Sequence, residues 1–104
     1  MIAIVSHAWL RNDNPTARAD AYVRITAEFE RVHETIAGYR GRRLLHGNDD
    51  PRHVVNIRFF DHADDYDRLI AHPDYATWIA RLSEHLEPHD PQREILSVLL
   101  ATDR

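Results

Sequence analysis

The chain contains no cysteine and no lysine, and only three glycines and one methionine among its 104 residues. Without cysteine, disulfide bonds, thiolate catalysis and cysteine-based metal sites are excluded. All 13 basic residues are arginine, which we attribute to a coding bias and not to function. The 17 acidic residues give a formal net charge of −4, which argues against nucleic-acid binding because that activity needs a basic surface.

Long apolar runs are also missing from the sequence. No segment approaches the roughly 18 apolar residues of a membrane-spanning helix, and residues 1–7 do not resemble a secretion signal. We therefore expect a cytoplasmic protein with no membrane partner. The length predicts a single domain over residues 1–104, and the balance of 43% hydrophobic and 29% charged residues is ordinary for a globular protein.

Apolar periodicity predicts alternating strands and helices. A strand over residues 2–10 leads through a turn into a helix over residues 15–37, where Gly38 is expected to end the helix with a positive φ. The other expected elements are strands over residues 39–47, 52–60 and 94–102, a short helix capped by Asp61, and a helix from Pro73 that ends before Pro88.

This order predicts an α+β, ferredoxin-like βαββαβ domain, with a four-stranded antiparallel sheet and its helices on one face. The other face would then expose a large apolar surface, to which Trp9, Leu44, Val55 or Phe60 and residues 95–100 contribute. We expect a homodimer in which two such faces pack together, since symmetric pairing buries the same surface twice.

The third strand carries an apolar row, Val55, Ile57 and Phe59, and a mixed row that includes Asn56 and Arg58. Successive residues of a strand point to opposite faces. We expect the apolar row to pack against the helices and the mixed row to line a partly polar cavity. His7 and Trp9, on one row of the first strand, are expected to line the same cavity, although Trp9 can instead fill the dimer core.

Four polar residues are candidates for chemistry. His46 can act as a base near neutral pH or can simply face solvent. Asn56 can hold a substrate carbonyl or oxyanion, or satisfy a neighbour within the sheet. Tyr66 can offer its hydroxyl group to the cavity or lie at its rim. Arg58 can pair with a substrate carboxylate or enolate, or form a salt bridge.

Two further candidates have plainer interpretations. Trp78 lies on a helical apolar stripe, which favours core packing, and Arg81 is of a type that is usually a surface cation. The histidines form no triplet with metal-ligand spacing, so we expect no metal site.

Together these residues form a pattern that resembles the antibiotic biosynthesis monooxygenase domains of the dimeric α/β-barrel superfamily. A Val54-Val55-Asn56 strand is followed by Phe60 and then Tyr66, with His46 ten residues before the asparagine. These offsets resemble those of the cofactor-free, quinone-forming members, and Arg81 is similar to a family arginine when one gap is allowed. The chain departs from the family at Phe60, which replaces a tryptophan and lacks its N–H donor.

The resemblance implies a cofactor-independent monooxygenase that oxidises a polycyclic phenol or hydroquinone in aromatic polyketide tailoring. His46 or Tyr66 would promote loss of the phenolic proton. Asn56 and Arg58 would hold the resulting oxyanion. Phe60 and Trp9 would stack on the rings, with Trp78, Arg81 and His7 as further substrate-binding candidates. Two alternatives stay open: a polyketide cyclase on the same fold, and a non-catalytic dimeric barrel that binds an aromatic small molecule.

Overall fold

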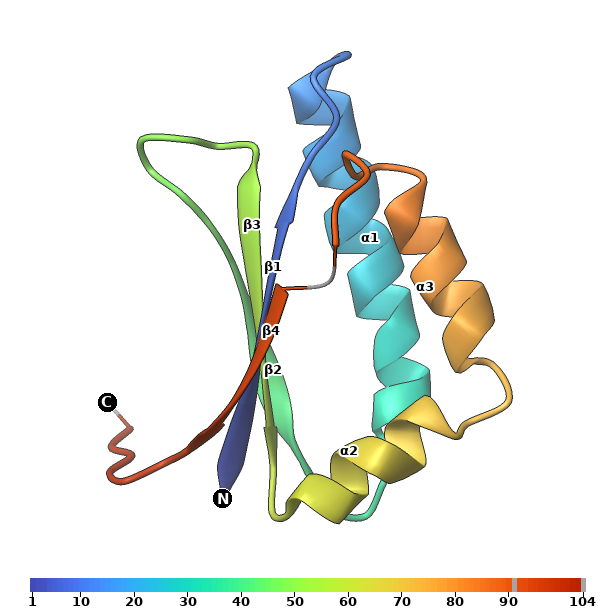
Figure 1. Ribbon diagram of the computed structural model, residues 1–104. Helices are drawn as coiled ribbons and strands as arrows, with labels where there is room; N and C mark the ends of the chain where they lie inside the picture. Colours follow the sequence, from blue (N-terminus) through green and yellow to red (C-terminus); the bar gives the residue numbers. More distant parts are fainter. Residues whose placement is uncertain (91, 104) are drawn as a thin grey trace.

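The computed structural model describes residues 1–90 and 92–103. Its elements are β1 (Ile2–Trp9), α1 (Pro15–His33), β2 (Tyr39–His46), β3 (His53–Phe60), α2 (Ala63–Ile70), α3 (Tyr75–Ser83) and β4 (Gln92–Ser97). The strands form one antiparallel sheet in the order β2-β3-β1-β4, and the helices cover one face of it (Figure 1). The predicted ferredoxin-like α+β fold is confirmed, whereas the barrel formed by two chains stays a prediction.

Helix α1 begins as the sequence predicts. The side chain of Asn14 caps it by accepting a hydrogen bond from the backbone N–H of Ala17 at 3.3 Å, and Pro15 occupies the first turn. The apolar stripe is buried against the sheet at Tyr22, Ile25 and Phe29. The helix ends at His33, however, and not at residue 37, and the glycine with a positive φ is Gly41, not Gly38.

Gly38 is instead required by close packing. A Cβ atom at this position would overlap the carboxylate of Asp65, which is almost fully buried. That carboxylate accepts a hydrogen bond from the backbone N–H of His62 at 2.9 Å and also binds Arg68. His62 is therefore the N-cap of α2, and the prediction that Asp61 caps this helix was wrong by one residue.

The predicted break at His72-Pro73 separates α2 from α3, which ends at Ser83, before Pro88. Strand β4 ends at Ser97, earlier than predicted. Leu99 and Leu100 beyond it are 98% and 82% exposed. This apolar tail leaves the sheet on the side away from the helices (Figure 1).

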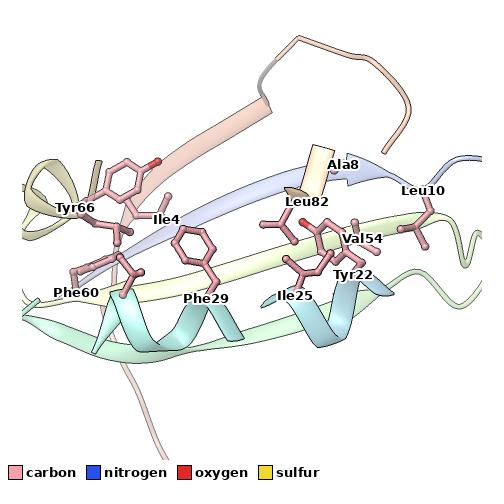
Figure 2. Packing of buried hydrophobic residues seen from close by; sticks show 12 residues of the cluster. Ile4, Ala8, Leu10, Tyr22, Ile25, Phe29, Val54, Phe60, Tyr66 and Leu82 are labelled. Atoms are coloured by element: carbon pink, nitrogen blue, oxygen red, sulfur yellow. The ribbon is translucent and has the colours of Figure 1, made fainter. Parts of the chain in front are cut away.

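The core lies between the sheet and the helices. Phe29 of α1 lies between one group formed by Ile4, Phe60 and Tyr66 and another around Tyr22 and Leu82 (Figure 2). No helix among residues 1–90 and 92–103 is long and apolar enough to cross a membrane.

The two rows of β3 face the sides opposite to those predicted. Arg58 pairs with Ile4, and Asn56 with Ser6, on the face that the helices cover. The apolar row, represented by Ile57, faces the open side of the sheet and is half-buried. Leu44 and Phe60, which were candidates for the open face, also lie on the helix side. Hydrophobicity alone misassigned the rows, because both faces of this strand are mostly covered or apolar.

Candidate functional site

A cavity of about 220 Å³ lies between the helix-covered face of the sheet and helices α1 and α3. The sheet contributes a polar floor, and the helices contribute mainly apolar walls. The floor includes Arg42, Asn56, Arg58 and Arg93 of the sheet. The walls include Tyr22, Phe29, Tyr75 and Leu82 of the helices.

Three of the predicted site residues carry buried polar atoms without a hydrogen-bond partner. They are Oδ1 of Asn56, Nε of Arg58 and the hydroxyl oxygen of Tyr66. Buried polar groups are normally paired, and an unpaired one costs about 1–3 kcal/mol. Asn56 and Arg58 line the cavity, and the guanidinium of Arg58 lies over the ring of Tyr66 at 5.1 Å. The atoms of Asn56 and Arg58 are therefore placed to bind a ligand, and Tyr66 lies next to Arg58 beside the cavity.

Two arginines in this region have no acidic partner. Arg58 is 4% exposed, and Arg93 of β4 lies over the ring of Tyr66 at 5.4 Å. Neither forms an ion pair with a carboxylate of residues 1–90 and 92–103. Because a buried, unpaired cation is costly, the position of Arg58 favours a negatively charged ligand, and the exposed Arg93 adds a second positive charge to the same cavity.

Arg42, the third cavity arginine, is held by a buried polar network. It pairs with Glu30, which also accepts the hydrogen bond of the Tyr39 hydroxyl at 2.8 Å. Burial, followed by the contact with Glu30, raises the pKa of Tyr39 to about 12. Arg42 donates to the ring of His33 at 2.9 Å, and burial together with this cation lowers the pKa of His33 to about 3. His33 is therefore neutral at neutral pH.

Tyr66 is suited to donate a hydrogen bond. Burial raises the pKa of its hydroxyl group, the nearby Arg58 partly offsets that rise, and Tyr75 adds to it. No hydrogen bond joins the two tyrosine hydroxyl groups, although they are neighbours. With a raised pKa, Tyr66 is protonated at neutral pH, so it acts as a donor and not as a base.

The structure does not bring His46 to this cavity. His46 is exposed and lines a second hollow, of about 250 Å³, between α1 and the β2–β3 hairpin. That hollow is largely apolar, and none of its lining side chains carries a buried atom without a partner. Tyr22 lines both hollows and lies at their boundary. We place the candidate site in the polar cavity because only there do unpaired polar groups converge.

His7 and Trp9 lie on the open face of the sheet. Both rings stack on His53, with ring centres 5.3 and 4.8 Å away, and Nδ1 of His7 is 3.0 Å from Nε2 of His53. Ser6 and Ala8 of the alternate row line the cavity, and His7 lines it as well, whereas Trp9 does not.

The remaining candidates are packing or surface residues. Phe60 is fully buried against Tyr39 and Tyr66 and does not line the cavity. Trp78 stacks on Phe29 with ring centres 5.6 Å apart. Arg81 lies over the indole of Trp78 at 4.5 Å and pairs with Glu28 of α1 at 3.3 Å.

The sequence did not indicate several polar residues of the cavity, among them Arg42, Tyr75, His89 and Arg93. Arg42 was detectable in principle, since it pairs with Arg58 across β2 and β3, but only once the register was known. Tyr75 and Arg93 carry no local signal, because they reach the cavity through the packing of α3 and β4. Among residues 1–90 and 92–103, no group of three or more potential ligands is arranged to hold a metal ion.

No family model matches the sequence, and no curated protein matches it. Several solved structures, however, superpose on this chain over most of its length. A protein of Nitrosomonas europaea, provisionally named an antibiotic biosynthesis monooxygenase, superposes with a TM-score of 0.78 at 17% identity, covering 98% of this chain and 93% of its own. A similarly named protein of Bordetella bronchiseptica gives 0.80 at 13% identity, with 95% and 97% covered.

A third structure is SnoaB, a cofactor-independent oxygenase of Streptomyces nogalater. It superposes with a TM-score of 0.74 at 16% identity, covering 99% of this chain and 97% of its own. At these identities the comparisons establish the fold. The resemblance to antibiotic biosynthesis monooxygenases that the sequence motifs indicated is therefore confirmed for the fold.

Proposed function

We propose that this protein is a cofactor-independent monooxygenase that oxidises a phenol or hydroquinone to a quinone in the cavity beneath α1 and α3. The supporting observation is the set of buried, unpaired atoms of Asn56, Arg58 and Tyr66. Together they provide an acceptor, a cationic donor and a hydroxyl group, which suits a ligand with one O–H group and one developing oxyanion.

The proposed reaction begins with formation of the substrate anion. No carboxylate lines the cavity among the described residues, and His46 lies elsewhere, but the imidazoles of His7 and His89 do line it. The positive field of Arg58 and Arg93 lowers the pKa of the bound phenol, and the proton passes to one of these imidazoles or to water at the cavity mouth. Tyr66 donates its hydrogen bond to the oxyanion, and Oδ1 of Asn56 accepts one from a neighbouring substrate O–H.

The electron-rich anion then reacts directly with O₂. One electron passes to O₂, and the carbon radical and superoxide combine to form a C–O bond and, with a proton, a hydroperoxide. Loss of water, formed from the distal oxygen and the hydrogen on the same carbon, leaves a carbonyl group. For an anthrone, the CH₂ group becomes C=O. One oxygen atom of O₂ enters the carbonyl group, and the other leaves as water with the two hydrogens of the CH₂ group, so atoms and electrons balance. The chain's residues orient the substrate and stabilise its charge.

The test is incubation under air with a two-ring naphthalene-type hydroquinone and, separately, with an anthrone, following quinone absorbance and O₂ uptake. We expect turnover above the buffer rate with one O₂ consumed per quinone. Tyr66→Phe should lower kcat/KM by roughly 100- to 1,000-fold, as loss of one oxyanion donor does, and Asn56→Ala should lower it because the substrate O–H loses its acceptor. Both should fold normally, because each removes a buried polar atom that has no partner.

Arg24→Gln is the matched control, since Arg24 is exposed and lines neither hollow. His46→Ala distinguishes between the two hollows. If this variant loses turnover, the reaction takes place in the apolar hollow and not in the polar cavity. Absence of turnover by the wild type would refute the oxygenase proposal and leave the ligand-binding alternative.

We also propose that the protein works as a homodimer through the open face of the sheet. Val5, Val55, Ile57 and Phe59 form an apolar centre there, half-buried in the single chain, and Leu45 and Leu96 beside them are 49% and 47% exposed. A contiguous apolar surface of this kind marks an interface. Pairing two such faces would bury it and would leave the cavity, on the other face, accessible.

A further inference from the structure

The size and charge of the cavity narrow the class of ligand that it can take. At about 220 Å³ the cavity falls below the roughly 300–1,000 Å³ that is typical of pockets for drug-sized ligands. Phe29, Ile79 and Leu82 form an apolar wall opposite the polar floor. The cavity therefore fits an aromatic body of one or two rings more closely than a polycyclic one.

The charges around this space have one sign. Arg42 is neutralised by Glu30, whereas Arg58 and Arg93 have no acidic partner among the described residues. Both residues line the cavity, and the guanidinium groups lie 5.1 and 5.4 Å from the centre of the Tyr66 ring, so both charges are at the end of the cavity nearest to Tyr66. Guanidinium groups bind two-oxygen anions through paired hydrogen bonds, and desolvation strengthens such contacts.

We propose that the ligand of this cavity is a small hydroxyaryl carboxylate of one or two rings, whose carboxylate pairs with Arg58 and Arg93. This inference rests on the proposed function for its reactive hydroxyl group, which would face Asn56 and Tyr66. The carboxylate is a permanent charge, so it compensates the two arginines before, during and after any oxidation. A single phenolate oxygen would satisfy only part of this donor set.

The test is a binding measurement without turnover. Calorimetric titration compares 1-hydroxy-2-naphthoate with its uncharged carboxamide under nitrogen. The wild type should bind the acid at least tenfold more tightly than the amide. Arg58→Gln and Arg93→Gln should each remove most of that preference while changing the affinity for the amide by less than threefold. Arg24→Gln, which removes the same charge from an exposed site, should leave both affinities unchanged.

Arg93 is an exposed residue of β4, so Arg93→Gln tests the inference even where Arg58→Gln does not fold. Arg58→Lys should keep part of the preference, since it retains the charge and loses the paired geometry. Equal affinity for acid and amide in the wild type, or a preference that survives both glutamine variants, would overturn the inference even if quinone formation is observed. Conversely, charge-selective binding without any oxidation would support it while the oxygenase proposal fails.

Discussion

His33 shows how a single buried residue ties stability to pH. The ring is completely buried, its Nδ1 hydrogen-bonds to the carbonyl group of Phe29 at 3.0 Å, and its pKa is lowered from 6.5 to about 3. The unfolded chain binds a proton as the pH falls through 6.5, whereas the folded chain does so only near pH 3. Stability is therefore complete above pH 6.5 and is lost progressively below it.

We expect the free energy of unfolding to fall by about 1.4 kcal/mol per pH unit from this group, or roughly 3 kcal/mol between pH 6.5 and pH 4. Urea denaturation at a series of pH values measures it. His33→Gln keeps the hydrogen-bonding capacity without the titration, so its curve should be flatter over this range. His46→Gln, at an exposed histidine, should follow the wild type. Parallel curves for all three proteins would contradict the prediction.

At the same scale, the sequence indicated some site residues and missed others for a physical reason. Asn56, Arg58 and Tyr66 stand out because polar groups are unusual in elements that are otherwise apolar, and all three carry buried, unpaired atoms. His46 was chosen by its offset and its chemistry, but an offset along the chain does not fix which hollow a side chain enters. Arg93 has no distinguishing pattern, because only the pairing of β1 with β4 places it.

At the scale of elements, the contact between Gly38 and α2 joins two segments that are distant in sequence. The backbone before β2 runs so close to the first turn of α2 that Asp65 occupies the space of the missing side chain. The carboxylate that fills this space is also the one that caps α2. The start of this helix and the path of the preceding loop are thus stabilised by one contact.

Gly38→Ala should lower the free energy of unfolding by about 2 kcal/mol or more, because the methyl group must displace a buried cap. Asp65→Ala alone should cost about 1 kcal/mol. In the double variant the new methyl group no longer meets a carboxylate. Its loss in free energy of unfolding should therefore be smaller than the sum of the two single losses, by about 1 kcal/mol or more. Urea denaturation of the four proteins completes the cycle, and strict additivity would show that the two residues do not interact.

Most elements were predictable because their signals are local. The asparagine–proline start of α1 and the His72-Pro73 break act through neighbouring backbone, and the structure has both. The ends of α1 and β4 were placed too late, since apolar residues such as Ile36 and Leu99 continue each pattern beyond the last residue of the helix or the strand. The faces of β3 depend on long-range pairing, which periodicity does not encode.

At the scale of the whole molecule, the open face of the sheet should control assembly. Ile57→Asp places a charge at the centre of this face, beside Val5, while the side chain stays half-exposed within one chain. We expect the wild type to be a dimer at micromolar concentration and this variant to be a folded monomer, as measured by sedimentation and circular dichroism. Val23→Asp makes the same change at a 56% exposed site on α1 and should remain dimeric. A monomeric wild type would refute the proposed interface.

Tyr22 is the boundary between the polar cavity and the apolar hollow, since its side chain contributes to the walls of both. The side chain of one core residue thus separates the two spaces. Replacement by a small residue would merge the two spaces into one elongated channel without altering the arginines or the tyrosine at the far end. Acceptance of larger ring systems is accordingly one mutational step away, and the fold can change its substrate range while its charged end stays the same.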